Sequence, residues 1–511
     1  MKKQAGHETF DFTNLFILEM ANNHQGSVQH GLRIIEACAE VVRKHGIRAA
    51  MKFQFRDLDT FIHPSDKKKS ENKHVARFRS TELSKKDFKT LIDAAKKAGM
   101  LTMATPSDEA SVDLLEELDV DILKIASASA GDWPLLEKAV TIGKPIVASV
   151  GGMKLPEVDN LVSFLDHRYA NFAIMHCVSI YPTPANKLNL KQIEVFKQSY
   201  PGVTIGFSTH EDPNNISAIQ IAYAKGARIF ERHVGVPAKD ITLNAYSSTP
   251  EQLDAWVGAW EVARSTEGTT ERDIDPKEEE DLALQKRGVF AKKALKKGAK
   301  LKRSDVYFAF PIRQRQLHSG GFREGSVIAD ASYKKDEPVS ESARDYTPTS
   351  RDLVYRPIHE VKAMLNVAHV AIPAEFMLEF THEYGLDQFR SYGAVAIDCI
   401  DREVKKRIVV QLPRQEFPLH HHTKAELTYY VLYGSLELEL GNRRKTVRPG
   451  DMVTVQPGVK HRFWNDAGVI FEELSEKRDG DSVVYEDRDI AKRPLKERLT
   501  KLTNWGRHQI D

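Results

Sequence analysis

Short apolar segments alternate with amphipathic segments along the first 240 residues of the chain. The amphipathic stretches at 31–43 and 86–98 repeat their apolar residues with a period of about 3.6, which predicts helices. Alternating strands and helices predict parallel strands, and eight such units in about 230 residues predict a (β/α)8 (TIM) barrel. The predicted strands are Phe16–Met20, Met51–Phe55, Leu101–Thr105, Ile122–Ser127, Pro145–Val150, Phe172–Val178, Thr204–Thr209 and Arg228–Val234.

The pattern changes twice in the rest of the chain. Segment 269–281 is acidic without an apolar period, which predicts a linker or an exposed helix, and 285–340 has short apolar runs around Gly298, which predict a small β-rich module. Further on, strand-like segments follow one another with only turns between them, which predicts an all-β, antiparallel jelly roll. These segments are Ala394–Ile400, Lys406–Leu412, Leu427–Val431, Leu436–Leu440, Met452–Val455 and Val469–Leu474. We therefore predict a barrel domain at 1–272, a linker at 273–284, a small module at 285–345 and a β-domain at 346–511.

The connection from Arg56 to Arg79 is long and polar and contains the lysine run 67–69. Connections of this kind in barrels are often substrate loops, and a solvated surface loop is the equally weighted alternative.

Composition excludes several classes of protein. The chain has 511 residues, with 74 Lys+Arg against 72 Asp+Glu, so a polybasic nucleic-acid binder is not expected. With 41% hydrophobic and 29% charged residues a globular protein is expected. No apolar run reaches 18 residues, so we expect no membrane span, and the N-terminal residues are not expected to act as a signal peptide. Its three cysteines, Cys38, Cys177 and Cys399, lie far apart, which predicts no disulfide framework and a reducing, cytoplasmic location.

Polar residues gather at the C-terminal ends of the predicted barrel strands, where barrel enzymes place their catalytic groups. They are Glu19, Lys52, Gln54, Thr105, Lys124, Ser127, Ser149, His176, Ser208, His210, Glu231 and His233. Because a buried charge needs a partner, Lys52 and Lys124 predict an anion bound between them, which the backbone amides of Gly151-Gly152 can approach. His210 and His233 end neighbouring strands beside Glu231, so they predict a divalent cation site with positions open for substrate; two structural histidines are the alternative.

A second cluster of potential metal ligands lies in the C-terminal domain. His420, His422 and Glu426 form an H-x-H-x3-E pattern, and His461 follows on another predicted strand. Residues i and i+2 of a strand share a face, so His420 and His422 can both point inward, and Glu426 and His461 would complete a site of three nitrogens and one oxygen. A cluster of buried histidines without metal is the alternative.

Seven segments of the barrel resemble, in order, the motifs of the N-acetylneuraminate (sialic acid) synthase family. They are ILEMANNHQGS (17–27), MKFQF (51–55), TMATPSDE (102–109), LKIASAS (123–129), HCVSIYPTP (176–184), IGFSTHED (205–212) and GARIFERHV (226–234). The module at 285–330 resembles that family's SAF (antifreeze-like) α+β domain. The β-domain resembles the cupin superfamily, and 381–487 within it resembles D-lyxose isomerase-like sugar isomerases.

The first resemblance implies condensation of phosphoenolpyruvate with an open-chain sugar aldehyde to a 2-keto-3-deoxy sugar acid, with release of phosphate. It implies Mn²⁺ or Mg²⁺ in the barrel and a homodimer in which the SAF domain caps the partner's active site. The cupin resemblance implies a second metal (Mn²⁺, Zn²⁺, Fe²⁺ or Ni²⁺) and an aldose–ketose isomerase that supplies the acceptor. The implied roles are catalysis for Glu19, Lys52, Lys124 and Glu231; substrate binding for Gln54, Thr105, Ser127, Ser149, Ser179, Tyr181 and Ser208; and metal binding for His210 and His233 in the barrel and His420, His422, Glu426 and His461 in the cupin.

The chain departs from the family pattern on the acceptor side. Ser129 replaces a glutamate, Thr209 replaces an aspartate, segment 241–248 lacks the sugar-binding aspartate, and Phe310 replaces the arginine of an Arg-Pro pair, although Arg313 and Arg315 follow. These changes predict the same reaction on a different sugar. A sugar-sensing or structural cupin, a pyruvate-using class II aldolase or lyase, and a carbohydrate-binding regulatory protein remain as alternatives.

Overall fold

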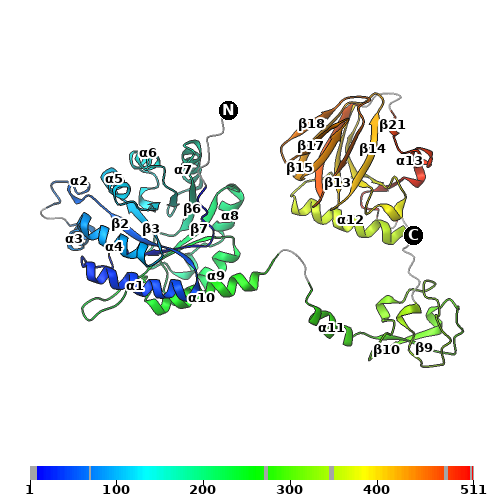
Figure 1. Cartoon of the computed structure of the whole chain (residues 1–511), viewed down its shortest axis with the longest axis horizontal. Helices are drawn as coiled ribbons and strands as arrows, with labels where there is room; N and C mark the ends of the chain where they lie inside the picture. Colours follow the sequence, from blue (N-terminus) through cyan, green and yellow to red (C-terminus); the bar gives the residue numbers. More distant parts are fainter. Residues whose placement is uncertain are drawn as a thin grey trace. The chain divides into compact units, whose positions relative to one another are not determined.

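The computed structural model describes residues 9–67, 71–269, 274–343, 350–476, 482–506 and 509. Parts of the predicted lysine run and of the predicted linker lie outside these residues. The chain divides into two compact units, Met1–Arg272 and Asp273–Asp511, and each is described by itself (Figure 1).

The first unit contains the closed eight-stranded parallel barrel that the sequence predicts (Figure 1). Each strand pairs with the next, and β1 pairs with both β2 and β8, so that Glu19 lies opposite Lys52 on one side and His233 on the other. The strands are β1 (Leu15–Glu19), β2 (Arg48–Phe55), β3 (Leu101–Pro106), β4 (Ile122–Ile125), β5 (Ile146–Ser149), β6 (Phe172–Cys177), β7 (Thr204–Thr209) and β8 (Ile229–His233).

The alternation of side chains along these strands creates a barrel with an apolar floor and a polar mouth. In β1, Leu15 and Ile17 belong to a buried apolar cluster with Ala50, Val147 and other strand residues, and Glu19 is the next residue on the same face. Strands β3, β4 and β5 follow the same rule, with Met103, Ile122 and Val147 on the floor and Thr105, Lys124 and Ser149 two positions later. Residues of the opposite parity pack outward against the helices.

The helices that cover the barrel are amphipathic, and local sequence sets their ends. Ser27 caps α1 by accepting a hydrogen bond from the His30 N–H, and Gly46 ends it with a positive φ of 60°. These helices are α1 (Val28–His45), α4 (Lys85–Lys97), α5 (Glu109–Glu117), α6 (Trp133–Thr141), α7 (Leu155–His167), α8 (Gln192–Ser199), α9 (Ser217–Ala224) and α10 (Pro250–Glu267), with short 3-10 turns at Ser127–Ser129 and Ala185–Lys187.

The long connection after β2 contains two short helices, α2 (Leu58–Phe61) and α3 (Lys73–Ser80). Phe61 of α2 and Phe78 of α3 have ring centroids 6.2 Å apart, so the described part of this connection is packed on itself.

The second unit begins with the exposed helix α11 (Pro276–Leu284) and a small module. In this module β9 (Gly288–Ala291) pairs antiparallel with β10 (Val306–Ala309), and short 3-10 turns lie at Arg303–Asp305, Ser319–Gly321 and Glu341–Ala343. A separate cluster of buried residues, including Val289, Leu301 and Val339, forms its core. Its assignment to the SAF type stays a prediction.

The rest of the second unit is a sandwich of two antiparallel sheets, as the sequence predicts. One sheet has the order β18-β15-β20-β13-β12-β11-β22 and the other the order β17-β16-β19-β14-β21. The strands are β11 (Met377–Thr381), β12 (Ala394–Asp401), β13 (Val404–Gln411), β14 (Glu416–His422), β15 (Leu427–Gly434), β16 (Leu436–Leu440), β17 (Arg443–Val447), β18 (Met452–Val455), β19 (His461–Trp464), β20 (Val469–Glu476), β21 (Val483–Tyr485) and β22 (Leu499–Thr503).

Helix α12 (Ser350–Val367) was not predicted, and neither were α13 (Arg488–Lys492) and the short turns at Leu386–Gln388 and Leu495–Glu497. The buried residues Val354, Ile358, Val361 and Leu365 of α12 pack in one apolar cluster with β11, β12 and β13. Their spacing of three and four residues is the helical signal that identifies such a face.

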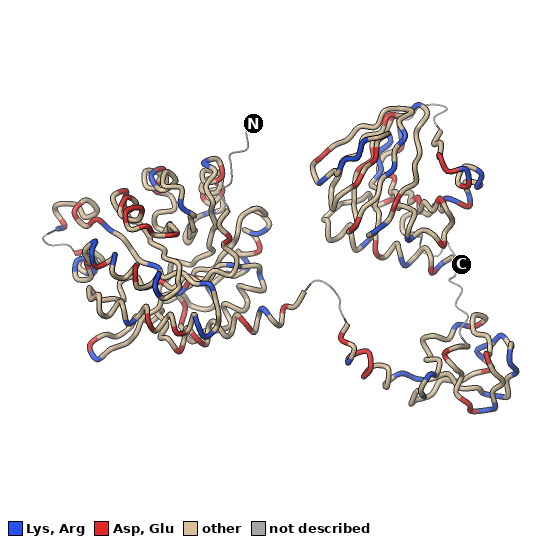
Figure 2. The backbone as a smooth tube through the Cα atoms, in the orientation of Figure 1, with Lys and Arg blue, Asp and Glu red and all other residues tan. Residues whose placement is uncertain are grey.

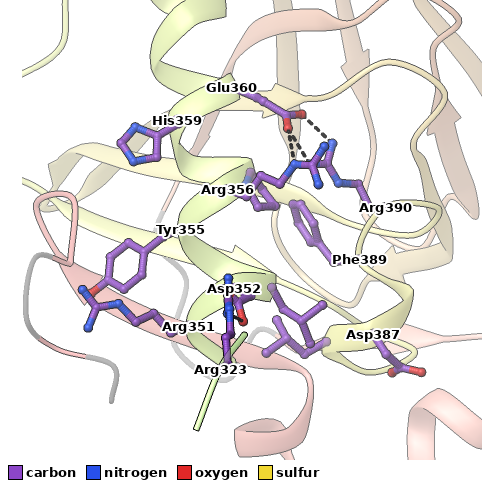
Figure 3. A pocket seen from close by; sticks show the side chains of 13 residues that line it. Arg323, Arg351, Asp352, Tyr355, Arg356, His359, Glu360, Asp387, Phe389 and Arg390 are labelled. Carbon is purple, nitrogen blue, oxygen red and sulfur yellow. Dashed lines mark hydrogen bonds and ion pairs between the residues drawn. The ribbon is translucent and has the colours of Figure 1, made fainter. Parts of the chain in front are cut away.

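A cavity lies beside α12, lined by Arg351, Tyr355 and His359 among others (Figure 3). The carboxylate of Glu360 in this cavity is paired with Arg390 and Arg356. Lys and Arg are interspersed with Asp and Glu along both units (Figure 2). No helix in the described residues is long and apolar enough to cross a membrane.

Candidate active site

All eight barrel strands contribute side chains to one cavity at their C-terminal ends. The lining residues are Glu19, Lys52, Gln54, Arg56, Phe61, Phe78, Thr105, Ser107, Lys124, Ala126, Ser127, Ala128, Ser129, Ser149, Cys177, Tyr181, Ser208, His210, Glu231 and His233. Every barrel residue to which we assigned a catalytic, substrate-binding or metal-binding role lies in this lining except Ser179, which adjoins it near Gly151.

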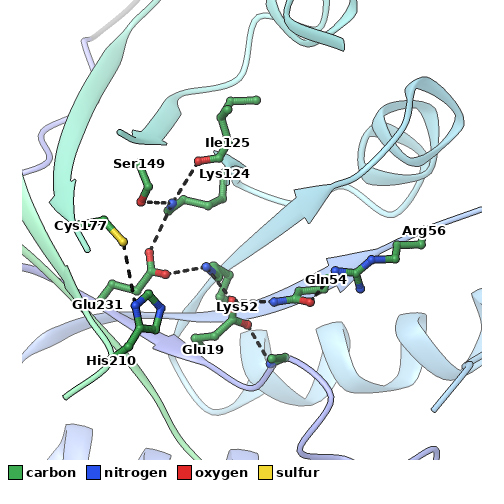
Figure 4. Close-up of polar contacts among 11 residues, drawn as sticks. Glu19, Lys52, Gln54, Arg56, Lys124, Ile125, Ser149, Cys177, His210 and Glu231 are labelled. Atoms are coloured by element: carbon green, nitrogen blue, oxygen red, sulfur yellow. Dashed lines mark hydrogen bonds and ion pairs between the residues drawn. The ribbon is translucent and has the colours of Figure 1, made fainter. Parts of the chain in front are cut away.

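A buried charge cluster forms the floor of the cavity (Figure 4). The Lys52 Nζ lies 2.6 Å from Glu19 Oε2 and 2.7 Å from Glu231 Oε1. Burial opposes the charge on Lys52, but the two carboxylates outweigh burial and raise its pKa above the usual range. Lys52 is therefore a permanent cation.

Lys124 lies on the other side of Glu231. Its Nζ donates to Ser149 Oγ at 2.6 Å and lies 3.7 Å from Glu231 Oε2. Burial lowers the pKa of Lys124 to about 8, although Glu231 counteracts this effect. Burial alone would raise the pKa of Glu231, but Lys124 and Lys52 together lower it below the usual range. Glu231 thus occupies the position between the lysines where we predicted a bound anion.

Hydroxyl groups surround the lysines. Among the described residues, the buried Thr105 Oγ1 has no hydrogen-bond partner, and Ser127 Oγ accepts from the Gly151 N–H at 2.9 Å. A Cβ at position 151 would lie 2.6 Å from Ser179 Oγ and 2.8 Å from Ser127 Oγ, so only glycine leaves the space between these two serines open. An unpartnered hydroxyl and an open cradle next to two lysines suit an anionic substrate.

His210 and His233 lie at the mouth, with ring centroids 5.3 Å apart. Burial lowers the pKa of each to about 3, so both imidazoles are neutral. The Nδ1–H of His210 can donate to the Val178 carbonyl at 3.3 Å, which leaves a lone pair on Nε2, and within the described residues the buried His233 Nδ1 has no partner. Neutral imidazoles with available nitrogens suit a divalent ion.

The described residues contain no group of three His, Cys, Asp or Glu side chains arranged to hold one ion. An ion in the barrel would therefore have His210 and His233 as its protein ligands and would complete its coordination with water or substrate.

A buried ion pair joins the strand ends that carry the two histidines. Glu211 follows His210, Arg232 precedes His233, and Arg232 NH2 lies 3.2 Å from Glu211 Oε1 with both side chains 1% exposed. Arg232 also donates to the Pro213 carbonyl at 3.1 Å. Since such a pair is costly to break inside a protein, it fixes the relative positions of β7 and β8.

The structure corrects the interpretation of His176. We placed it among the strand-end groups of the mouth, but it has the outward parity of β6. Its Nε2 contacts the Leu188 carbonyl at 2.7 Å, and its ring stacks on Phe207 outside the barrel.

Sequence reasoning missed several residues of the site, of which Arg56 lines the cavity and Tyr246 packs beside its histidines. Tyr246 lies in the divergent segment 241–248, and its ring centroid is 5.1 Å from His233 and 5.3 Å from Tyr181. Arg56 follows Gln54 by two positions, so the face rule that identified Gln54 also identifies Arg56. Phe61 and Phe78 carry no comparable signal in the sequence.

The predicted cluster in the C-terminal sandwich assembles in part. Ring centroids of His420 and His461 are 4.1 Å apart, and those of His420 and His422 are 5.8 Å apart. The Nδ1 atoms of His420 and His461 contact the carbonyls two residues earlier in their own strands, at 2.8 and 3.0 Å. Glu426, however, is exposed and accepts a hydrogen bond from Gln456 at 2.6 Å, so the structure does not gather the four-ligand set.

Comparisons with known proteins place both regions. A model of the NeuB family matches residues 40–272, and a model of the cupin domain matches 407–472. A Chromobacterium violaceum structure described as spore coat polysaccharide biosynthesis protein E is 40% identical, with a TM-score of 0.62, over 65% of this chain and 99% of that one.

Curated relatives are more distant. The N,N'-diacetyllegionaminic acid synthase of Campylobacter jejuni is 26% identical over 64% of this chain and 99% of its own length. The N-acetylneuraminate-9-phosphate synthase of Drosophila melanogaster is 34% identical over 42% of this chain, and the match spans 59% of that protein. The chain therefore belongs to the NeuB family, and it carries a cupin domain in its C-terminal region.

Proposed function

We propose that the barrel condenses phosphoenolpyruvate with the aldehyde of an open-chain sugar. Carbon 3 of phosphoenolpyruvate bonds to the aldehyde carbon, water adds to carbon 2, and the carbon 2–oxygen bond to phosphate breaks. The products are inorganic phosphate and a 2-keto-3-deoxy sugar acid. The observation that carries this proposal is the paired set Lys52–Glu231–Lys124 next to two neutral histidines in one cavity.

The lysines and hydroxyls bind the anionic donor. Lys52 and Lys124 offer two cationic donors to the phosphate and carboxylate, and Thr105, Ser127, Ser149 and Ser208 offer hydroxyls around them. Because these groups are buried and already oriented, they stabilise negative charge on the departing phosphate without reorganising.

The two carboxylates have different freedom to act on water. Glu19 Oε1 accepts from the Ala21 N–H at 2.7 Å and Oε2 contacts Lys52 and Gln54. The buried Glu231 Oε2 has no hydrogen-bond partner among the described residues. We therefore assign to Glu231 the positioning of the water that adds to carbon 2, and to Glu19 the orientation of Lys52.

The mouth of the cavity suits the sugar. A divalent ion on His210 and His233 would supply a Lewis acid for the aldehyde oxygen. Tyr181 lines the cavity beside His210, Tyr246 packs against Tyr181 and both histidines, and Gln54 offers its amide. Ser129, where the family has a glutamate, also lines the cavity, so we propose an acceptor other than that of the sialic acid synthases.

For the cupin domain we propose a metal-dependent aldose–ketose isomerase that supplies the acceptor. His420 and His461 are buried, and burial lowers the pKa of both, to about 4 for His461, so both rings are neutral. Tyr485 lies beside His420, with ring centroids 5.7 Å apart, and is hydrogen-bonded to Glu383, which gives the cluster a group that can hold or move a proton. A divalent ion held by the histidines would stabilise negative charge on the sugar oxygens.

We also propose a homodimer, and this proposal rests only on the resemblance to the sialic acid synthase family. The module at 285–345 would cap the cavity of a partner subunit, with Arg313 or Arg315 in place of the arginine that Phe310 replaces. Phe310 is 65% exposed within this chain.

Loss of either floor lysine should abolish turnover. We expect Lys52→Met and Lys124→Met each to reduce kcat/KM for phosphoenolpyruvate by at least ~100-fold, since each removes a charge-assisted contact made at the transition state. The measurement follows phosphate and keto-acid formation with a panel of aldoses and N-acylated aldoses. The matched control is Lys144→Met, a half-buried lysine just before β5, at the opposite end of the barrel.

The three-carbon donor that the enzyme uses distinguishes the proposed condensation from the pyruvate-using aldolase or lyase. Product formed from pyruvate without phosphate release would replace the proposal with an aldolase. Unchanged kcat/KM in both floor variants would contradict the assigned roles of the lysines.

The affinity for phosphoenolpyruvate should decline in alkaline solution. The lowered pKa of Lys124, about 8, means that its charge is present below pH 8 and is lost above it. Since the anion binds the charged form, the dissociation constant should rise about tenfold per pH unit above 8. Titration calorimetry from pH 7 to 9.5 measures this, and Lys124→Arg, which stays charged, should remove the alkaline weakening. A flat profile in the unmodified protein would contradict the assignment.

The activities of the two domains should be distinguishable by supplying either a ketose or the matching aldose. We expect His422→Ala and His461→Ala to abolish keto-acid formation from a ketose plus phosphoenolpyruvate and to leave formation from the matching aldose within about twofold. His421→Ala on the same strand is the control, because its ring contacts Glu486 at 3.4 Å. If the unmodified chain uses an aldose but no ketose, the isomerase proposal fails and a sensing or structural cupin takes its place.

A further inference from the structure

Arg56 is a cation in the barrel cavity to which the proposed reaction gives no role. It comes directly after β2 and lines the cavity together with Gln54, Phe61 and Phe78. Its side chain lies on the far side of Gln54 from Lys124 and Ser149 (Figure 4). Arg56 therefore lies next to Gln54, to which we assign the acceptor, and away from Lys124, one of the two lysines to which we assign the donor.

Two contacts hold the guanidinium of Arg56 in place, but they use few of its N–H donors. Arg56 NH2 donates to Gln54 Oε1 at 2.9 Å, and its Cζ lies 4.1 Å from the ring centroid of Phe78. In the described parts of the chain the buried Nε has no hydrogen-bond partner, and Arg56 makes no ion pair. A guanidinium has five N–H donors, and a buried unsatisfied donor is costly, so the arrangement favours a ligand that accepts from it.

The two carboxylates whose charge acts on Arg56, Asp108 and Glu19, bond to other groups. Asp108 accepts from the Ser111 N–H through one oxygen and from the Asp57 N–H through the other, at 2.8 and 3.0 Å. Glu19 is paired with Lys52 at 2.6 Å. Arg77 on α3 adds a second positive charge near Arg56. The outer part of the cavity therefore carries a positive charge that no described side chain neutralises by direct contact.

We propose that Arg56 binds an anionic group, a phosphate or a carboxylate, at the end of the open-chain acceptor opposite its aldehyde. The planar guanidinium, packed on Phe78, offers a pair of parallel donors of the kind that such groups accept. This inference rests on the proposed condensation and names its substrate class. Family membership does not decide the matter, because one relative is named for a 9-phosphate product and another is not.

Three open-chain probes isolate the charge of that group. D-Mannitol, D-mannitol 1-phosphate and D-mannonate differ at one end of the chain, and none has an aldehyde that can react. Their binding is measured by titration calorimetry with saturating phosphoenolpyruvate and Mn²⁺, so that the donor already fills the lysine site. The proteins are the unmodified full chain, Arg56→Gln, Arg56→Lys, and Arg79→Gln as an exposed control on α3.

We expect mannitol 1-phosphate or mannonate to bind ~10- to 100-fold more tightly than mannitol, as a charged hydrogen bond would require. The stronger of the two identifies the group as phosphate or carboxylate. Arg56→Gln should remove the preference, Arg56→Lys should retain part of it, and Arg79→Gln should leave it unchanged.

Equal or unmeasurable binding of the three probes, or a preference that survives Arg56→Gln, overturns the inference. Failure of the proposed condensation is measured in a separate assay, in which no aldose would cause release of phosphate from phosphoenolpyruvate. The charge preference does not depend on that assay, so the two claims fail independently.

Discussion

The pairing of charges inside the barrel is the constraint on which the rest of the structure depends. A lysine or glutamate in a barrel interior is very unfavourable alone, yet Lys52, Glu19, Glu231 and Lys124 are all at most 4% exposed. They are tolerated because each touches an opposite charge or a hydroxyl. The cluster holds the floor of the cavity in one geometry and keeps it polar in the absence of substrate.

The same cluster explains why a donor with two anionic groups would fit. Glu231 is shared between two lysines, so an incoming phosphate and carboxylate can take over contacts that this one carboxylate makes. Once displaced from a lysine, the carboxylate is free to accept a proton. The neutral histidines lie above this layer, and the Glu211–Arg232 pair holds their strands together. The floor groups stay charged because each has an oppositely charged neighbour, and the histidines at the mouth are neutral because burial lowers their pKa.

Much of this was readable from the sequence, because the barrel repeats one rule. Leu15, Ile17 and Glu19 show it in a single strand, with an apolar floor and a polar end on the same face. The same rule, applied strictly, would have excluded His176, which points out of the barrel, and would have included Arg56, which points into the cavity. Tyr246 could not be found, since it reaches the histidines from a segment with no regular period. That Glu231 would be the counter-ion of both lysines depends on distances across the barrel that no local pattern encodes.

In the C-terminal domain the strand alternation predicted the sheets, and the i, i+2 spacing brought His420 and His422 together. The prediction that Glu426 joins them was wrong: Glu426 is exposed and bonded to Gln456, because the turn after β14 and not the strand sets its direction. Helix α12 was missed among strand-like segments although its buried residues keep helical spacing.

A crystal structure of the protein with bound phosphoenolpyruvate and a divalent ion tests the central claim most directly. The account predicts donor oxygens within hydrogen-bond distance of the Lys52 and Lys124 ammonium groups, and the ion bound by His210 and His233. A donor bound elsewhere, with both lysines still held by Glu231, would contradict it.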